Sequence, residues 1–265
     1  MTKQLILILI ILILLPYAQA TYITLRTTLI SNQDSIFIST TNNGDESAYN
    51  LQVTLATPTN TLNSDIQKEL RVSGYLNETF KLQPASLLPG SYPLIITIDY
   101  TDANNYPFSA ISTAIYNNKE STRPGLILSM PAIDISGSKK LKLEIKNLDD
   151  YDKEVTARII VPKELSISSQ QSIKIKGKDS SSLSFNVKDF AARPDSSYAI
   201  FAIAEYEKDS RHYTAVYSSN VKIVKSLNIP TYLLILPLAI LLVIFIIYWL
   251  KKRKHESKHS DSNKE

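Results

Sequence analysis

The feature that most restricts how this chain can fold is a duplicated pattern of alternating apolar residues. Tyr92 and Tyr100 stand eight residues apart, and Tyr198 and Tyr206 repeat the same spacing. Between the two tyrosines of each pair, apolar residues occupy every second position, which is the period of a β-strand with one buried face. The match continues over most of ~100 residues at an offset of about 103 to 107, so the sequence predicts two copies of one β-domain.

Turn signals divide each copy into about six or seven short strands, and no segment between residues 21 and 228 sustains a helical period. We therefore predict an all-β fold of two tandem immunoglobulin-like β-sandwich domains, at 21–118 and 126–227. The polar segment 119–125, closed by Pro-Gly, is the expected linker. Because it is short, we expect the domains to stack as a semi-rigid rod. Matched positions include Ile36 with Leu143, Ile38 with Ile145, Leu70 with Ile173, and Phe80 with Phe185.

An uninterrupted apolar run, Tyr232–Leu250, precedes the carboxyl terminus. Nineteen such residues in a helix reach ~28 Å, close to the thickness of a bilayer core, so we predict a transmembrane α-helix at 230–250. The basic residues that follow predict a cytoplasmic tail at 251–265. The expected membrane-interface anchors are Tyr232, Tyr248, Trp249, Lys251, Lys252, Arg253 and Lys254.

The amino-terminal residues resemble a secretory signal peptide. Lys3 precedes the apolar segment Leu5–Leu15, and Ala18 and Ala20 fit the small-residue cleavage positions. We predict a cleaved signal at 1–20, with an uncleaved anchor as the alternative. Together the two ends predict a single-pass protein of the cell membrane, with its β-domains outside the cell.

Charge and cysteine content narrow the class of protein further. Residues 21–120 carry 5 basic and 9 acidic side chains, whereas residues 121–228 carry 17 and 13. The sum is neutral, which argues against nucleic acid as a partner. The basic second half suits anionic lipid headgroups or head-to-tail contact between molecules, but scattered surface charge without a role is the favoured explanation. With no cysteine, each domain must be held by its core alone.

The segment Asn42–Val53, followed by Leu88–Tyr92 and a hairpin, resembles the Ig-like repeats of archaeal S-layer-associated surface proteins. Those repeats are similar to CARDB and NEW3 adhesion-type domains. The second copy departs from the pattern, with Leu148 and Asp149 where the Asn-Gly turn would stand. The resemblance implies surface display, cell adhesion or envelope architecture, sometimes beside a transport system, and it carries no catalytic residues.

Candidate chemical sites are few. The segment His255–His259 fits H-E-x-x-H, but it lies in a short charged tail without a third ligand or a cleft, so we do not expect a zinc protease. His212 is expected to cap or line a sheet edge. Two acidic loops, at 102–105 and 149–152, offer oxygens to calcium, but turn formation explains both loops and is the favoured interpretation. We therefore predict no catalytic residue, cofactor or metal site.

Asn77 begins the chain's only N-x-[ST] sequon, in a polar stretch expected between strands, and is a candidate glycosylation site. The function favoured by the sequence is that of a non-enzymatic surface protein, whose two domains serve as a spacer or interaction module in envelope assembly or adhesion. An accessory subunit of a membrane complex such as a transporter is the alternative, and a carbohydrate-binding module is the third. Expected partners are membrane lipid, through one span, and proteins at the surface or in the membrane.

Overall fold

The computed structural model describes residues 22–32, 35–82 and 86–225, together with five helical residues of the carboxyl-terminal unit: Leu242, Phe245, Ile246, Tyr248 and Trp249. The predicted signal peptide, most of the predicted span and the basic tail lie outside the described residues. Among the residues that are described, no helix is both long and apolar enough to cross a membrane.

All seventeen regular elements between residues 25 and 223 are β-strands, which confirms the all-β prediction for this part of the chain. We call residues 22–118 lobe 1, residues 119–125 the linker and residues 126–225 lobe 2. The strands of lobe 1 are β1 (Leu25–Ser31), β2 (Ser35–Asn42), β3 (Ala48–Ala56), β4 (Thr61–Asn63), β5 (Gln67–Leu70), β6 (Tyr75–Lys81), β7 (Gly90–Thr101) and β8 (Pro107–Asn118). Those of lobe 2 are β9 (Leu126–Ser129), β10 (Ile133–Ile135), β11 (Ser138–Asn147), β12 (Lys153–Ile160), β13 (Leu165–Ile167), β14 (Gln171–Ile175), β15 (Ser180–Asp189), β16 (Ser197–Lys208) and β17 (Arg211–Ile223).

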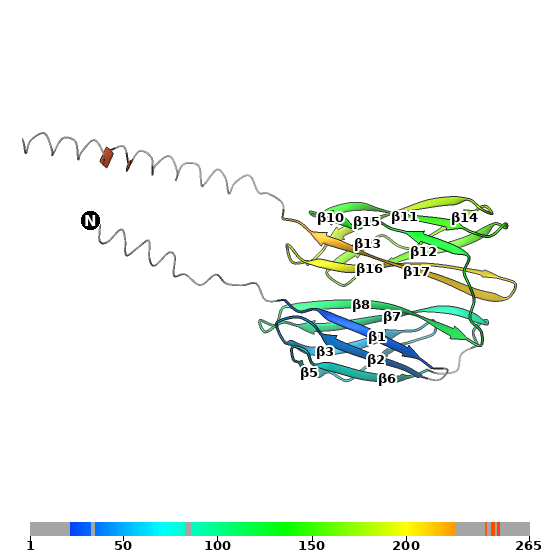
Figure 1. Ribbon diagram of the computed structural model, residues 1–265, viewed down its shortest axis with the longest axis horizontal. Coiled ribbons are helices and arrows are strands. Elements are labelled where there is room, and N and C mark those ends of the chain that lie inside the picture. The colour runs from blue at the N-terminus through cyan, green and yellow to red at the C-terminus, as the bar shows by residue number, and fades with distance from the viewer. Residues whose placement is uncertain are drawn as a thin grey trace, which may run out of the picture. The chain divides into compact units, whose positions relative to one another are not determined.

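Each lobe has strands in two sheets and one apolar core (Figure 1). In lobe 1 the sheet β1-β2-β6 is accompanied by β8-β7-β3, with β4 and β5 pairing to β3. In lobe 2 the sheet β9-β11-β15-β13 is accompanied by β17-β16-β12-β14, with β10 running parallel to β17.

The cores form because apolar residues alternate with polar ones along each strand. In β11, Leu141, Leu143 and Ile145 are fully buried while Lys142 and Glu144 between them are exposed. In β16, the predicted inward-facing set from Tyr198 to Tyr206 is buried as expected. A period of two therefore places one face of each strand in the core and the other outside it.

Asn42 and Asn147 show how the two copies correspond. Each is fully buried at the end of a strand, and each donates two hydrogen bonds from Nδ2 to backbone carbonyls. The acceptors are Glu46 O and Leu70 O in lobe 1, and Tyr151 O and Lys176 O in lobe 2. The same side-chain framework therefore holds the same turn in both lobes.

The offset between these asparagines, from 42 to 147, is 105 residues, and it corrects part of the predicted correspondence. The sequence pairing of these strands was displaced by two residues because period-two patterns match equally well after a shift of two. The corrected pairs are Ile36 with Leu141, Ile38 with Leu143, and Leu70 with Ile175.

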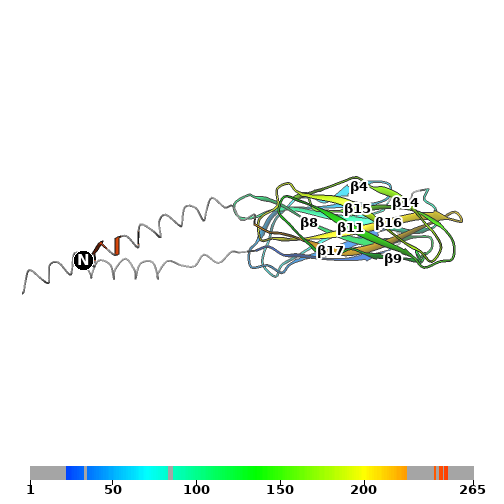
Figure 2. The ribbon, with the colours of Figure 1, turned by 90° about the horizontal axis from the view of Figure 1, so that it is seen from above.

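The sequence led us to expect two domains stacked as a rod. The structure differs, because strands of the two lobes belong to one shared sheet. His212 at the start of β17 pairs in parallel with Gly90 at the start of β7, and this pair joins a ten-stranded sheet across both lobes. Strands β8 and β16 also lie in contact. The strands of both lobes are aligned along roughly the same axis (Figure 2). Contact between the lobes is therefore lateral.

Candidate functional site

The backbone pairing of Gly90 with His212 is the centre of the contact between the lobes, which we call the joint. His212 N donates to Pro89 O at 3.0 Å, and Thr214 Oγ1 donates to Ser91 O at 2.7 Å. Gly90 has a φ of +142°, and a Cβ at this position would collide with the backbone carbonyl of His212. The close approach of the two strands therefore requires glycine here.

The linker is held between the lobes by Thr122. Thr122 and Ser91 exchange hydrogen bonds, each backbone N–H donating to the other's hydroxyl at 2.9 and 3.0 Å. Thr122 Oγ1 in turn donates to His212 O at 2.7 Å. The Thr122 hydroxyl therefore connects the linker to both strands of the joint, β7 and β17.

The His212 side chain lies inside the joint, whereas the sequence led us to expect that it caps or lines a sheet edge. Its ring stacks on Tyr92 at 4.1 Å between centroids, and Nε2 is 3.1 Å from Glu205 Oε1. Arg158 pairs with the other oxygen of Glu205 at 2.7 Å. Burial, reinforced by Glu207 and Glu205, raises the pKa of the Tyr92 phenol.

A second set of contacts joins β8 to the loop after β12. The buried Glu164 carboxylate accepts from Ser109 N at 2.6 Å and from Ser109 Oγ at 2.7 Å. Lys163 Nζ reaches Asp99 Oδ2 at 2.6 Å. Burial, followed by the charge of Glu164, raises the pKa of Tyr100. These contacts anchor lobe 2 to lobe 1 away from the linker.

Ile203 shows that the contact also buries apolar surface. The alternation of β16 places Ile203 opposite the inward-facing residues, where a lone sandwich would expose it. Its side chain is nevertheless 0% exposed, and it belongs to the apolar core of neither lobe. Since β16 lies against β8, the contact between the lobes accounts for this burial.

Lys153 is a buried cation that the sequence did not reveal. Its Nζ donates to Pro124 O at 2.8 Å and Gly125 O at 3.1 Å, and it pairs with Asp149 at 2.7 Å. Burial lowers the pKa of the Lys153 ammonium, while its hydrogen bond lowers the pKa of the Asp149 carboxyl. The equivalent position in lobe 1 is Ala48, so the signal was a lysine where the repeat has an apolar residue.

The two acidic loops considered for calcium use their oxygens within the protein. Asp102 Oδ1 accepts from the backbone of Asn104 and Tyr106, and its other oxygen is 3.6 Å from Arg193. Across the described ranges, no group of three or more acidic, histidine or cysteine side chains is arranged to hold a metal ion. The second loop forms the pairs Asp149–Lys153, Asp150–Lys178 and Asp152–Lys174.

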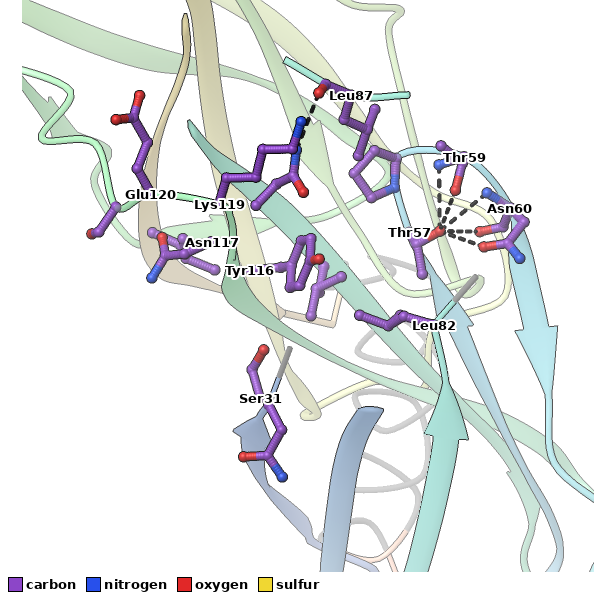
Figure 3. Close-up of a pocket in the computed structure, with 16 residues that line it drawn as sticks. Ser31, Thr57, Thr59, Asn60, Leu82, Leu87, Tyr116, Asn117, Lys119 and Glu120 are labelled. Atoms are coloured by element: carbon purple, nitrogen blue, oxygen red, sulfur yellow. Dashed lines mark hydrogen bonds between the residues drawn. The ribbon is translucent and has the colours of Figure 1, made fainter. Parts of the chain in front are cut away.

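A pocket of about 640 Å³ opens at one end of lobe 1, beside the linker (Figure 3). Leu82, Leu87 and Tyr116 contribute apolar surface, and amide and hydroxyl groups supply most of the remaining lining. In the turn after β3, Thr57 Oγ1 hydrogen-bonds Asn60 through both its backbone and its side chain. This volume falls in the range that holds small molecules.

Of the predicted site residues, Asn77 lies on β6, away from the joint. Asn77 is exposed on β6, within a strand and not between strands, where it pairs with Ser39 at the edge of a three-stranded sheet. Tyr248 and Trp249 are helical. The other anchors, Tyr232 and the cluster Lys251, Lys252, Arg253 and Lys254, lie outside the described residues.

No protein-family model matches the chain, and a search of curated proteins finds no match. Among solved structures, it aligns with an Escherichia coli alpha-2-macroglobulin activated by porcine elastase at a TM-score of 0.30 and 10% identity, over 78% of this chain and 23% of that one. It aligns with a red sea bream transglutaminase at a TM-score of 0.25 and 11% identity, over 76% and 31%. The chain spans less than a third of either protein, and these scores support no assignment of function.

Proposed function

We propose that this chain is a membrane-anchored, non-enzymatic surface protein whose two lobes act together as one rigid spacer or interaction module in envelope assembly or adhesion. The joint is the observation that carries the proposal. Lobes connected by a free linker move independently by default, because few contacts cross between them. Here a backbone pair, a clamped linker and a buried carboxylate oppose that motion.

The strand arrangement supports the immunoglobulin-like part of the proposal. In lobe 1, β2 pairs with β6 in one sheet and β3 with β7 in the other. In lobe 2, the equivalent strands pair in the same way, β11 with β15 and β12 with β16. Tyr92 OH donates to Leu88 O at 2.9 Å, and Tyr198 OH accepts from Arg193 N at 3.1 Å. A tyrosine near the start of a strand, bonded to backbone a few residues upstream, is a hallmark of immunoglobulin-like sandwiches.

The membrane topology rests on the sequence at the two ends and can be tested with single cysteines, because the chain has none. On intact cells, a membrane-impermeant maleimide should label Ser182→Cys in lobe 2. It should label Ser260→Cys, in the tail, only after lysis. Labelling of Ser260→Cys but not Ser182→Cys on intact cells would show the opposite orientation.

Rigidity can be tested with a pair of spin labels, one on each lobe. Lys81→Cys and Lys188→Cys place labels at exposed strand positions of β6 and β15. A rigid joint gives one narrow distance distribution by pulsed electron paramagnetic resonance. A broad distribution would contradict a rigid spacer without bearing on membrane topology.

The pocket in lobe 1 supports carbohydrate binding as a second candidate function. Its amide and hydroxyl lining beside Tyr116 suits a neutral hydroxylated ligand, because such groups both donate and accept hydrogen bonds. Thr59→Trp should block this pocket and abolish any binding to neutral oligosaccharides, whereas Thr28→Trp, on the exposed face of β1, should not. A glycan array without neutral ligands would set this candidate aside.

A further inference from the structure

The outer face of lobe 2 carries a row of cationic side chains. Lys140, Lys142 and Lys146 occupy exposed, outward positions of β11, and Lys188 follows at an outward position of β15. We call these four residues the lysine face. Strands β9, β11 and β15, which form this sheet with β13, are labelled in Figure 2. Glu144 is the single acidic residue among the outward positions of β11.

Small polar residues lie beside the lysines. Each outward residue of β11 pairs with a polar residue of β15, so the lysines alternate across the sheet with short side chains. The register is Lys140 with Asn186, Lys142 with Ser184, Glu144 with Ser182, and Lys146 with Ser180. On the β15 side, short side chains therefore flank the lysines of β11, and their hydroxyl groups can donate and accept hydrogen bonds.

The lysine face differs from four other lysines of lobe 2 in having no carboxylate partner. Lys153, Lys163, Lys174 and Lys178 each lie within 4 Å of an aspartate. Within the described ranges, none of the four residues of the lysine face forms such a pair. These cations are therefore available to an external anion.

The repeat shows that the fold does not require these lysines. At the 105-residue offset, the outward positions of β2 carry neutral residues where β11 carries its charges. Ser35, Phe37, Ser39 and Thr41 stand in place of Lys140, Lys142, Glu144 and Lys146. The same scaffold thus presents neutral outward positions on β2 of lobe 1 and charged ones on β11 of lobe 2.

We infer that the lysine face binds an anionic polysaccharide, one built from uronic acids or sulfated sugars. Outward residues of a strand repeat every ~7 Å, so Lys140 and Lys146 are separated by ~20 Å along one line. A linear track of cations fits an extended polyanion better than a single small ion, and the adjacent serines can bond to sugar hydroxyls. The outward positions of β11 and β15 carry no apolar side chain, and the exposed apolar residues Ile127, beside Lys146, and Phe190, just after β15, lie at the edges of the lysine face. Polar side chains, and not a continuous apolar patch, therefore surround most of these cations, which favours a polysaccharide over a lipid surface. This inference names a partner beyond the proposed spacer role.

The test measures binding of the full chain, in neutral detergent, to immobilised polygalacturonate at about 50 mM salt, where exposed charges interact over longer distances. In the reference protein and in every variant tested, Lys251, Lys252, Arg253 and Lys254 are replaced by serine, so that the tail does not bind the polyanion. Lys140→Ser, Lys142→Thr and Lys146→Thr are introduced together. We expect about tenfold weaker binding, since each exposed charge contact contributes modestly.

The matched control is Lys174→Ser, Lys176→Ser and Lys178→Ser together, which changes the net charge equally at and beside β14. Retained binding in this control and retained thermal stability in both variants support the inference. Equal loss in both triple variants, or equal binding of neutral dextran, would overturn it. Binding to vesicles of equal parts phosphatidylglycerol and phosphatidylcholine, without binding to polygalacturonate, would overturn it in favour of a lipid surface.

Discussion

Single residues that depart from the simple alternation of apolar and polar side chains have the most specific roles in this protein. Gly90 permits two strands from different lobes to approach, and Lys153 replaces an apolar residue to bind the end of the linker. Asn42 and Asn147 are buried polar side chains whose hydrogen bonds are satisfied by backbone, as burial requires. At this scale, single side chains or their absence decide how the loops and the joint are built.

Gly90→Ala should destabilise the full chain by ~2 kcal/mol or more, because the new Cβ collides with rigid backbone. Chemical denaturation provides the measurement. Gly137→Ala is the matched control, since Gly137 also has a positive φ but has open space around it, and it should cost about 1 kcal/mol. Equal losses in the two variants would show that conformational strain, and not the joint, accounts for the effect.

Asp149→Asn should destabilise the protein near pH 7 by about 2 kcal/mol, because it leaves buried Lys153 without its anion while Asp149 itself is partly solvated. In the folded protein, the pKa of the Asp149 carboxyl lies below its ordinary value of 3.8. Its charge therefore contributes stability above about pH 4, and that stability is lost as pH falls through the folded pKa. Denaturation measured from pH 7 to pH 2 should show the variant and the natural protein converging. A constant difference across this range would exclude the ion pair as the cause.

Equivalent strands have the same pattern of buried apolar residues in the two lobes, but some of them pair with different strands. β4 pairs with β3, whereas β13, at the corresponding place in lobe 2, pairs with β15 in the opposite sheet. The loop before β13 carries Lys163 and Glu164 to lobe 1. A change in edge pairing therefore accompanies the use of this loop for contact between the lobes.

Glu164→Ala should cost ~3 kcal/mol, because it leaves the amide and hydroxyl of Ser109 buried without their acceptor. Glu164→Gln keeps one acceptor oxygen and should recover most of that loss. Thermal and chemical unfolding of the full chain provide the measurement. Glu154→Ala, on the exposed face of β12, should change stability by less than ~0.5 kcal/mol. A Glu164→Ala protein as stable as Glu154→Ala would mean that this contact contributes nothing to the joint.

The two lobes form one compact unit ending at Val224. Their contact combines backbone pairing, a tethered linker, charge pairs and the burial of Ile203. Such a contact couples the stability of each lobe to that of the other.

Unfolding of the full chain should therefore show a single calorimetric transition for the β-strands. Lobe 2 prepared alone, as residues 126–225, exposes Ile203 and loses the anchor of Glu164, so it should melt at a lower temperature. For a domain of ~100 residues, each kcal/mol lost lowers the midpoint by roughly 4–8 °C. Two separate transitions in the full chain, with lobe 2 unchanged by isolation, would show that the lobes are independent.

The sequence by itself determined the β-class, the duplication, the turns at Asn42 and Asn147, and the inward-facing residues, because these depend on local period and turn chemistry. It led to a register displaced by two residues, because alternation is unchanged by such a shift. The sequence also led us to place Asn77 between strands, because β6 contains many polar residues and a polar strand is difficult to distinguish from a loop.

Only the tertiary structure decided that the lobes meet side by side. His212, Glu164 and Ile203 belong to no motif, and each acquires its role from a residue more than 50 positions away or from the opposite lobe. Local patterns report which face of a strand is buried by its own sandwich. They do not report burial against a second sandwich, because that depends on contacts between segments distant in the chain.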